Sequence, residues 1–454
     1  MIKKNTENYL IYSLISSIIF LLVYNIINYD PIYGYDAEAH HSYIDYIAMY
    51  LPNSFNLPNF EATREFFNPP LPYIFPSLVQ IICRNFASSS NLLKTCQPIY
   101  GFYTQIFQSL LFVTSIYMYL KIFKKIRNKI KFLDLSVILL FCLLTVNYKT
   151  FSMIRGEPYI IFFNSILIYQ FLLLCKKSFK YKLKDIFIFG ILIGCLALSR
   201  QWAFLLFPSY FLLIFFIKSS IERKRYIKFI TFSFSIGFII SSWFYFGLFF
   251  EYGSFTAFNK QPSAFNLLNQ PLAFYIPYGE EMIYLFTKPI RPYFSNTFLP
   301  ILYSDLWGDY WGYFSFTSRS LDTGRNQLLI GDYLARVNIV SLFPTFLMIL
   351  GLRTGIKSLR TSAKKENDYF YSYITLSIFV TFFGFLWFLI KYPALPTGDT
   401  NKATYMIQLF HLLSILSINY LDKLKEINLK KYTIILSILI FVFIHNFSAM
   451  MSHF

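Results

Sequence analysis

Long apolar runs separated by polar segments make up most of the chain. A transmembrane helix needs roughly 20 mainly apolar residues, with a range of about 17–25, and the shorter runs reach that length with flanking Tyr and Trp. No small-residue cleavage site follows the first run, so we expect it to be retained as a helix. The pattern predicts an all-α polytopic membrane protein with about 11 transmembrane helices. The runs cover residues 9–27, 100–120, 133–148, 158–175, 186–199, 202–217, 229–250, 338–352, 370–390, 404–421 and 432–447.

The distribution of basic residues predicts which side of the membrane each loop faces. Only 14% of the residues are charged, whereas soluble proteins have about 25%. With a cytoplasmic N-terminus, 27 of the 41 Lys and Arg residues fall in short inside segments, and the others are spread over far longer outside loops. Short cytoplasmic loops are enriched in Lys and Arg. We therefore attribute most of the net charge of +18 to topology and discount nucleic acid as a partner.

The long polar segments all fall on the outer side. We divide the chain into a transmembrane module at 1–250, whose first outer loop covers 28–99, an outer region at 251–337 for sugar or acceptor recognition, and C-terminal transmembrane helices at 338–454. The inside loops are short, and the nucleotide-binding patterns GxxxxGK(S/T) and GxGxxG are absent from the sequence. Nucleotides are scarce outside the cell, so chemistry there needs an already activated substrate, which points to a lipid carrier.

The first outer loop opens with a dense group of candidate catalytic side chains. The stretch YGYDAEAHHSYIDY places Asp36, Glu38 and His40 just after the first apolar run. On a helix, Asp36 and His40 share a face because they are four residues apart, whereas Glu38 lies on another face. A carboxylate can act as general base toward a hydroxyl or an amine. Asp36 is our first candidate and Glu38 our second, with His40 orienting the base or joining a proton relay.

A proline pair follows in the same loop, in EATREFFNPPLPYIFPSL. The residue before a proline favours extended backbone and proline suits the first turn of a helix. We therefore expect an interfacial helix to start at Pro69 and Pro70. Together, YDAEAHH and FNPPLPY resemble the GT-C superfamily of polytopic glycosyltransferases, in particular the protein O-mannosyltransferases and the lipid A aminoarabinose transferases. The resemblance implies that Asp36 is the catalytic acid, although many members have two adjacent acids, which Ala37 separates here.

Two further segments resemble the same superfamily. IRGEPYIIFFNSILIY is similar to the start of its fourth helix and brings Arg155 and Glu157 to the outer face. GILIGCLALSRQWAFLLFP is similar to its fifth and sixth helices, which turn around an outer arginine, here Arg200. The resemblance implies transfer of a hexose or pentose from a polyprenyl-phosphate carrier to a glycan, lipid or protein acceptor. It would take place at the outer face of a bacterial inner membrane, in the synthesis of cell-envelope glycans.

The implied reaction needs positive side chains, because negative charge grows on the departing lipid phosphate. Candidates for this role, and for substrate binding, are Arg155, Arg200, Arg291, Arg336 and Lys402. In the outer region, YSDLWGDYWGYF places Asp305 and Asp309 among aromatic residues, and we assign this segment to recognition of the sugar or the acceptor. The reaction requires no cofactor, and a divalent cation held by a pair of acids stays open.

The cysteines predict no metal site, because no Cys/His spacing typical of one occurs. Cys83 and Cys96 both lie in the first outer loop, where an oxidising environment permits a disulfide; two free thiols are the alternative.

Several structural alternatives stay open at this point. Asp36 with His40 can be a helix cap, and Arg155 with Glu157 a structural ion pair. Arg200 can extend toward water, Lys402 can contact lipid headgroups, and the W-G segment can be a packed loop core. The alternative functions are a transporter or flippase, or a polymerase or ligase, of lipid-linked glycans. A transporter would show charges at mid-membrane and broken helices in two repeated halves, whereas the sequence has few central charges and no visible repeat. A polymerase or ligase usually concentrates its function in a later outer loop, so the acid in the first loop favours the transferase.

Overall fold

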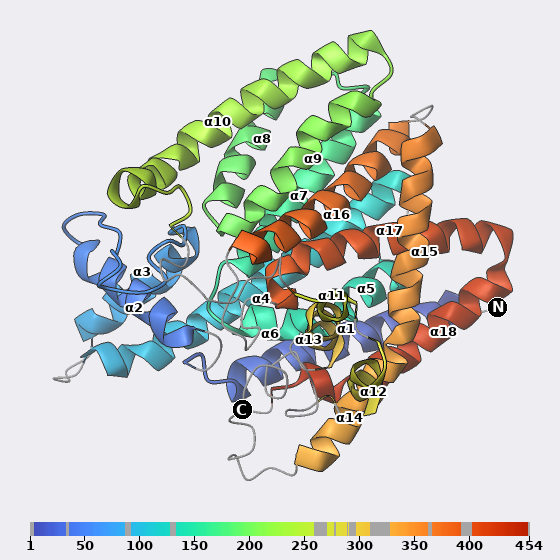
Figure 1. Cartoon of the computed structure of the whole chain (residues 1–454), viewed down its shortest axis with the longest axis horizontal. Helices are drawn as coiled ribbons and strands as arrows, with labels where there is room; N and C mark the ends of the chain where they lie inside the picture. Colours follow the sequence, from blue (N-terminus) through green and yellow to red (C-terminus); the bar gives the residue numbers. More distant parts are fainter. Residues whose placement is uncertain are drawn as a thin grey trace.

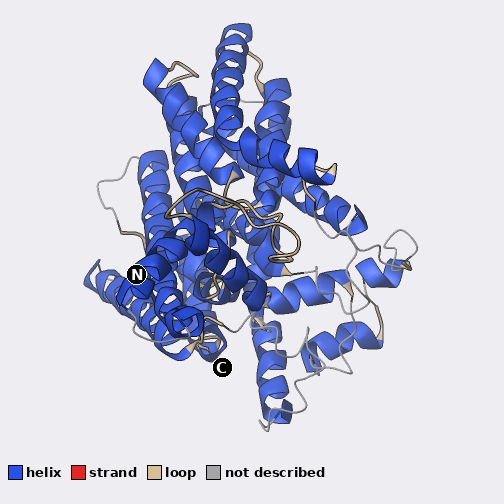
Figure 2. Ribbon diagram, turned by 90° about the vertical axis from the view of Figure 1, so that its left-hand side faces the viewer, coloured by secondary structure: helices blue, strands red, loops and turns tan. Residues whose placement is uncertain are grey.

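The structure is a computed structural model that describes residues 4–32, 36–86, 92–127, 133–257, 270–276, 278–287, 289, 297–308, 327–361, 366–391 and 402–452. The regular elements in these ranges are all helices, with no strand among them (Figure 2), which confirms the predicted all-α class. The helices are α1 (Lys4–Asn28), α2 (Ala37–Tyr50), α3 (Leu71–Phe86), α4 (Leu92–Arg127), α5 (Leu135–Cys142), α6 (Thr145–Ser152), α7 (Glu157–Lys176), α8 (Leu183–Ala197), η1 (Gln201–Leu206), α9 (Phe207–Leu212), η2 (Leu213–Phe216), α10 (Ser220–Tyr252), α11 (Leu272–Tyr275), α12 (Glu280–Thr287), α13 (Phe298–Trp307), α14 (Gln327–Val340), α15 (Leu342–Thr361), α16 (Glu366–Lys391), η5 (Ala403–Met406), α17 (Ile407–Ile427), α18 (Leu429–His445) and η6 (Ser448–Met450).

The predicted apolar runs all fall on helical segments. Seven of the described helices are long and apolar enough to cross a membrane, and the number is eight if α5 and α6, bent by 64° at their break, form one span. The remaining runs form α8, the η1–α9–η2 segment and α18, which are shorter. The predicted 11 runs therefore correspond to seven or eight full spans plus shorter apolar helices, because hydropathy does not show where a helix breaks.

The break between α5 and α6 carries polar side chains into the interior of the bundle. Every residue of both helices is buried. The side-chain amide of Asn147 on α6 donates to the carbonyl oxygen of Phe141 at 2.7 Å, and its Oδ1 lies 2.9 Å from Nε2 of His411 on α17. Buried polar groups need hydrogen-bond partners. α6 can therefore lie inside the bundle because neighbouring helices supply those partners.

Close helix packing accounts for the glycines of GILIG. α8 packs along α10, and a Cβ added at Gly194 would lie 2.7 Å from Ile240, while one added at Gly237 would lie 2.5 Å from Ile193. Small residues allow transmembrane helix backbones to approach closely. Glycine at these crossings sets the separation of α8 and α10.

The first outer loop lies at one end of the bundle. Figure 1 shows α2 and α3 at the opposite end from the N-terminus and from the turn between α17 and α18. α3 is amphipathic, since Leu78, Ile82 and Phe86 are exposed whereas Tyr73 and Gln80 are buried, as expected for an interfacial helix. The N-terminus and the turn between α17 and α18, both predicted to be cytoplasmic, thus lie at the end away from α2 and α3. The side of the membrane that each end faces stays a prediction.

A disulfide closes this loop. Cys83 on α3 and Cys96 on α4 are joined, 13 positions apart in the sequence. α2 packs on α3, and α3 packs on α4. The disulfide therefore fixes the support on which α2 lies.

Candidate active site

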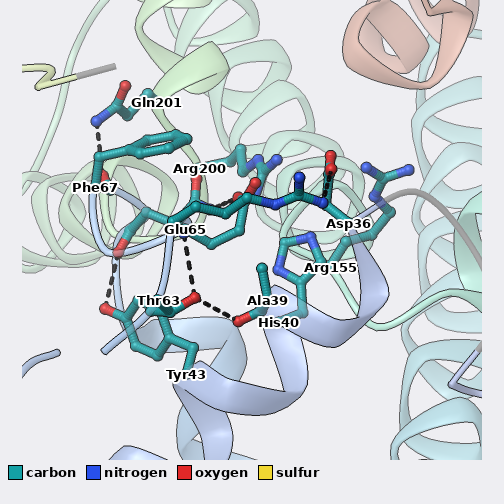
Figure 3. A network of polar contacts seen from close by, with 12 residues as sticks. Asp36, Ala39, His40, Tyr43, Thr63, Glu65, Phe67, Arg155, Arg200 and Gln201 are labelled. Carbon is teal, nitrogen blue, oxygen red and sulfur yellow. Dashed lines mark hydrogen bonds and ion pairs between the residues drawn. The ribbon is translucent and has the colours of Figure 1, made fainter. Parts of the chain in front are cut away.

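Asp36 stands at the start of α2 in an unusual backbone conformation. Its φ is 59° and its ψ is 19°, in the left-handed region, which non-glycine residues adopt rarely and at a cost of about 1–3 kcal/mol. Its side chain makes no capping hydrogen bond to α2, so the helix-cap alternative is not supported. The carboxylate instead accepts a hydrogen bond from Nη2 of Arg64 at 2.5 Å (Figure 3).

The loop that carries Arg64 and Glu65 is tied to α2. Thr63 donates its hydroxyl to the carbonyl oxygen of Ala39 at 2.7 Å, and Tyr43 donates to the carbonyl oxygen of Asn68 at 2.9 Å. Figure 3 shows these contacts below the charged side chains. Asp36 and the residues opposite it are therefore held by one set of backbone contacts.

Figure 3 shows Glu65, Arg155 and Arg200 near Asp36, and these three side chains belong to a buried network of ion pairs. Nε of Arg155 lies 3.1 Å from Oε2 of Glu157, and Nε of Arg200 lies 3.4 Å from Oε1 of the same carboxylate. Nη1 of Arg200 also lies 3.5 Å from Oε2 of Glu65. None of these four side chains is more than 7% exposed. Arg200 is thus buried and paired, which excludes the alternative that it extends toward water.

The two arginine-bearing turns touch because residue 156 has no side chain. A Cβ at Gly156 would overlap the backbone carbonyl oxygen of Ser199. Glu157 is the first residue of α7, and a carboxylate is favoured there by the helix dipole. The order Arg-Gly-Glu therefore brings Arg155, Glu157 and Arg200 together.

The proline motif supports the same turn from the other side. Pro69 and Pro70 are buried and directly precede α3, as the sequence predicts. The backbone N–H of Leu71 donates to the carbonyl oxygen of Leu198 at 3.3 Å. Gln201 donates to the carbonyl oxygen of Phe67 at 2.7 Å. These contacts hold the motif against the turn that carries Arg200.

Lys402 completes the basic side of the site. It is only 4% exposed. This argues against the alternative that Lys402 contacts lipid headgroups. Its Nζ lies 5.5 Å from the ring centroid of Tyr405, and the guanidinium carbon of Arg155 lies 5.7 Å from the same centroid. A cation over an aromatic ring is attracted by the ring quadrupole. Tyr405 therefore holds two cations near each other.

These cations control the charge of Asp36. Burial acts to raise the pKa of Asp36, but Lys402, Arg64, Arg155 and Arg200 together outweigh burial and hold that pKa below its ordinary value. The carboxylate is therefore ionised at neutral pH.

Glu65 and His40 respond in other ways to the same surroundings. Burial raises the pKa of Glu65, with Arg200 acting in the opposite direction. Burial, followed by the positive charges of Arg200 and Arg155, lowers the pKa of His40, which is neutral. Nδ1 of His40 lies 2.8 Å from the hydroxyl of Tyr73, whereas Nε2 is buried with no hydrogen-bond partner among the described residues. Tyr73, not Asp36, thus fixes the ring of His40.

Other predicted residues lie apart from this network. Glu38 is exposed on α2, and Arg336 is exposed on α14. Asp305 is fully buried, with its carboxylate paired to Lys149, which argues against the predicted contact with a sugar or an acceptor. Trp307 beside it is also buried, as in the packed-core alternative. Asp309 and Arg291 lie outside the described residues.

The sequence interpretation overlooked Arg64, Glu65, Lys149 and Tyr405. The first two lie close before the proline motif, which could have drawn attention to them. Lys149 follows an apolar run, and an ionisable residue in such a place is a functional candidate by default. In the part of the chain that the structure describes, no three His, Cys, Asp or Glu side chains are grouped so as to hold a metal ion; the side chains that surround Asp36 are mostly basic.

Comparison with known proteins identifies the fold. No protein-family model matches the chain, and no curated protein matches its sequence. The crystal structure of the oligosaccharyltransferase of Archaeoglobus fulgidus in complex with Zn and sulfate is similar, with a TM-score of 0.52 and 13% identity, over 96% of this chain and 52% of that one. The oligosaccharyltransferase AglB of the same organism, in complex with an inhibitory peptide and a dolichol-phosphate, gives a TM-score of 0.48 and 12% identity, over 97% and 55% of the two chains.

The first of these likenesses shows that the chain shares the fold of that oligosaccharyltransferase. A fold of this kind is what the sequence resemblance to polytopic glycosyltransferases leads us to expect. The chain spans about half the length of the oligosaccharyltransferase that it matches.

Proposed function

We propose that the protein is a glycosyltransferase that moves a sugar from a polyprenyl-phosphate carrier to an acceptor at the outer face of the membrane. The observation that carries this proposal is a carboxylate, Asp36, which is paired with Arg64 and lies near Arg155, Arg200 and Lys402. A base beside several cations suits a reaction that takes a proton from the acceptor while negative charge grows on a departing phosphate. The similarity in fold to an oligosaccharyltransferase supports the same class of reaction.

In the proposed step, an oxygen or nitrogen of the acceptor attacks the anomeric carbon of the donor sugar. The bond between that carbon and the phosphate oxygen breaks, and the phosphate leaves with both bonding electrons. Asp36 accepts the proton of the nucleophile. A carboxylate with a lowered pKa is a weak base, so the proton moves only as the new bond forms and the nucleophile becomes more acidic.

Asp36→Asn is the variant that tests the proposal. Membranes that contain the wild-type protein are supplied with a panel of radiolabelled polyprenyl-phosphate sugars, and transfer is measured at equal expression. Glu38→Gln is the matched control, since Glu38 lies two residues away and is exposed.

We expect transfer by the wild type and by Glu38→Gln, and none by Asp36→Asn. Transfer that survives in Asp36→Asn and disappears in Glu38→Gln would make Glu38 the base. If the wild type transfers no sugar of the panel, the transport of lipid-linked glycans becomes the better interpretation.

A further inference from the structure

An ion pair inside the bundle lies outside the network around Asp36. Lys149 on α6 and Asp305 on α13 are paired, and neither side chain is exposed. A buried ion pair often adds little net stability, because desolvation of the two charges offsets their attraction. Stability alone therefore gives no strong reason for this pair, and the other contacts of Asp305 indicate a different role.

The second oxygen of Asp305 binds the backbone of η5. Oδ2 accepts a hydrogen bond from the backbone N–H of Ala403 at 2.6 Å. The next residue, Thr404, makes a hydroxyl–hydroxyl hydrogen bond with Thr150 on α6. α13 and α6 thus each make a hydrogen bond to one of two consecutive residues of η5, and both residues are buried.

Lys402 directly precedes Ala403, the first residue of η5. The backbone carbonyl of Lys402 accepts a hydrogen bond from the N–H of Tyr405 at 3.1 Å, and its ammonium lies over the ring of Tyr405. The same ring is near Arg155, which follows α6 by three residues. The position of Lys402 relative to Arg155 and Asp36 is therefore set by the contacts between η5 and α6.

We propose that Asp305 is a positioning residue, which through Ala403 holds Lys402 opposite Asp36 to receive the phosphate of the lipid-linked donor. The role in donor binding rests on the proposed function; the placement of Lys402 does not. This role replaces the contact with sugar or acceptor that the sequence predicted for Asp305.

Two double variants separate the hydrogen bond from the charge. Lys149→Met with Asp305→Asn removes both charges and keeps an oxygen that can accept from Ala403. Lys149→Met with Asp305→Leu removes both charges and that acceptor. The two proteins differ only at residue 305, so a purely structural role of the ion pair predicts the same behaviour for both.

The first readout needs no substrate. The purified full-length protein is treated briefly with limiting acetic anhydride, and acetylation of Lys402 is measured by mass spectrometry relative to the exposed Lys430. Leaving a buried donor without its partner typically changes an equilibrium by about tenfold or more. We expect an increase of that size in the labelling of Lys402 in the Leu double variant, and labelling like the wild type in the Asn double variant.

The second readout is binding of a sugar-free polyprenyl phosphate in detergent. We expect the Leu double variant to bind it about tenfold more weakly, by the same reasoning, and the Asn double variant to bind it like the wild type. On a Lys402→Met background the Leu double variant should cause no further loss, because effects through a shared group are not additive.

The outcomes distinguish the two proposals. Equal labelling of Lys402 in both double variants would overturn the positioning role. Unequal labelling together with no binding of polyprenyl phosphate by the wild type would leave the positioning intact and contradict the proposed donor. If the Leu double variant does not fold, Ala403→Pro removes the N–H that donates to Asp305 and leaves both charges in place. Lys402 already has the extended backbone that a following proline requires. The variant should increase labelling of Lys402, and unchanged labelling would overturn the positioning role.

Discussion

Glu157→Gln is the substitution expected to destabilise the protein most directly. The carboxylate of Glu157 contacts two buried arginines: Oε2 lies 3.1 Å from Nε of Arg155, and Oε1 lies 3.4 Å from Nε of Arg200. Glutamine has nearly the same volume, so the variant removes a charge without leaving a cavity. Its effect therefore measures how much the two guanidinium groups depend on this carboxylate.

The expected loss follows from the distances and the burial. At an effective dielectric constant of about 20, each attraction amounts to roughly 5 kcal/mol before desolvation. Breaking a buried pair by removing one partner typically costs about 3–5 kcal/mol net. An unfolding entropy of about 2.1 cal/mol/K per residue gives roughly 1 kcal/mol/K for a chain of 454 residues. The melting temperature should then fall by about 3–5 °C, and by more where membrane helices keep structure on unfolding.

The assay is thermal unfolding of the detergent-solubilised protein, followed as the fraction that stays monodisperse after heating. Glu61→Gln is the matched control, because Glu61 is exposed in the loop that also carries Glu65. It should melt like the wild type. A shift of about 1 °C corresponds to roughly 1 kcal/mol for this chain. If Glu157→Gln melts within about 1 °C of the wild type, the two arginines do not depend on Glu157 and the electrostatic argument is wrong.

Three further outcomes are expected. Lys402→Met removes a charge that lowers the pKa of Asp36, so the acidic limb of the kcat/KM profile should move to higher pH; an unmoved limb would mean that another group titrates. Gly156→Ala should cost about 1–3 kcal/mol because its Cβ meets backbone, whereas Gly247→Ala, with no atom within 4 Å, should melt at or above the wild-type temperature. Reducing the disulfide, whose cysteines are 13 positions apart, should cost about 3 kcal/mol, and an unchanged melting temperature after reduction and alkylation would contradict this.

The sequence predicts the features of this protein that depend on local pattern. Apolar runs identify the helices, and the position of Asp36 after the first run identifies the start of the site. Arg155, Glu157 and Arg200 are recognisable because they interrupt apolar runs at turns on the predicted outer side. In each case the informative neighbours lie within a few residues, so the chemistry is visible before the fold is known.

Contacts between distant segments are not predictable in this way. Lys149 and Asp305 are 156 positions apart, and no periodicity connects them. Asp305 lies in a segment rich in aromatic residues, which looks like a sugar platform in the sequence. Of the aromatic residues described there, Trp307 belongs to the core and Tyr303 packs against it. Arg64 meets Asp36 across a loop whose course depends on contacts with α2. The half of the site that orients Asp36 therefore becomes visible only in three dimensions.

The charge of the site matches both ends of the proposed reaction. Counted by formal charges, the four basic side chains Arg64, Arg155, Arg200 and Lys402 exceed the three acidic ones, Asp36, Glu65 and Glu157, by one positive charge. A sugar linked to a polyprenyl phosphate is a phosphodiester with one negative charge, which this excess balances. When the sugar is transferred, the phosphate gains a second negative charge, and Asp36 is neutralised by the proton that it accepts. The excess then becomes two, so a base placed among cations keeps the site balanced as charge develops on the leaving group.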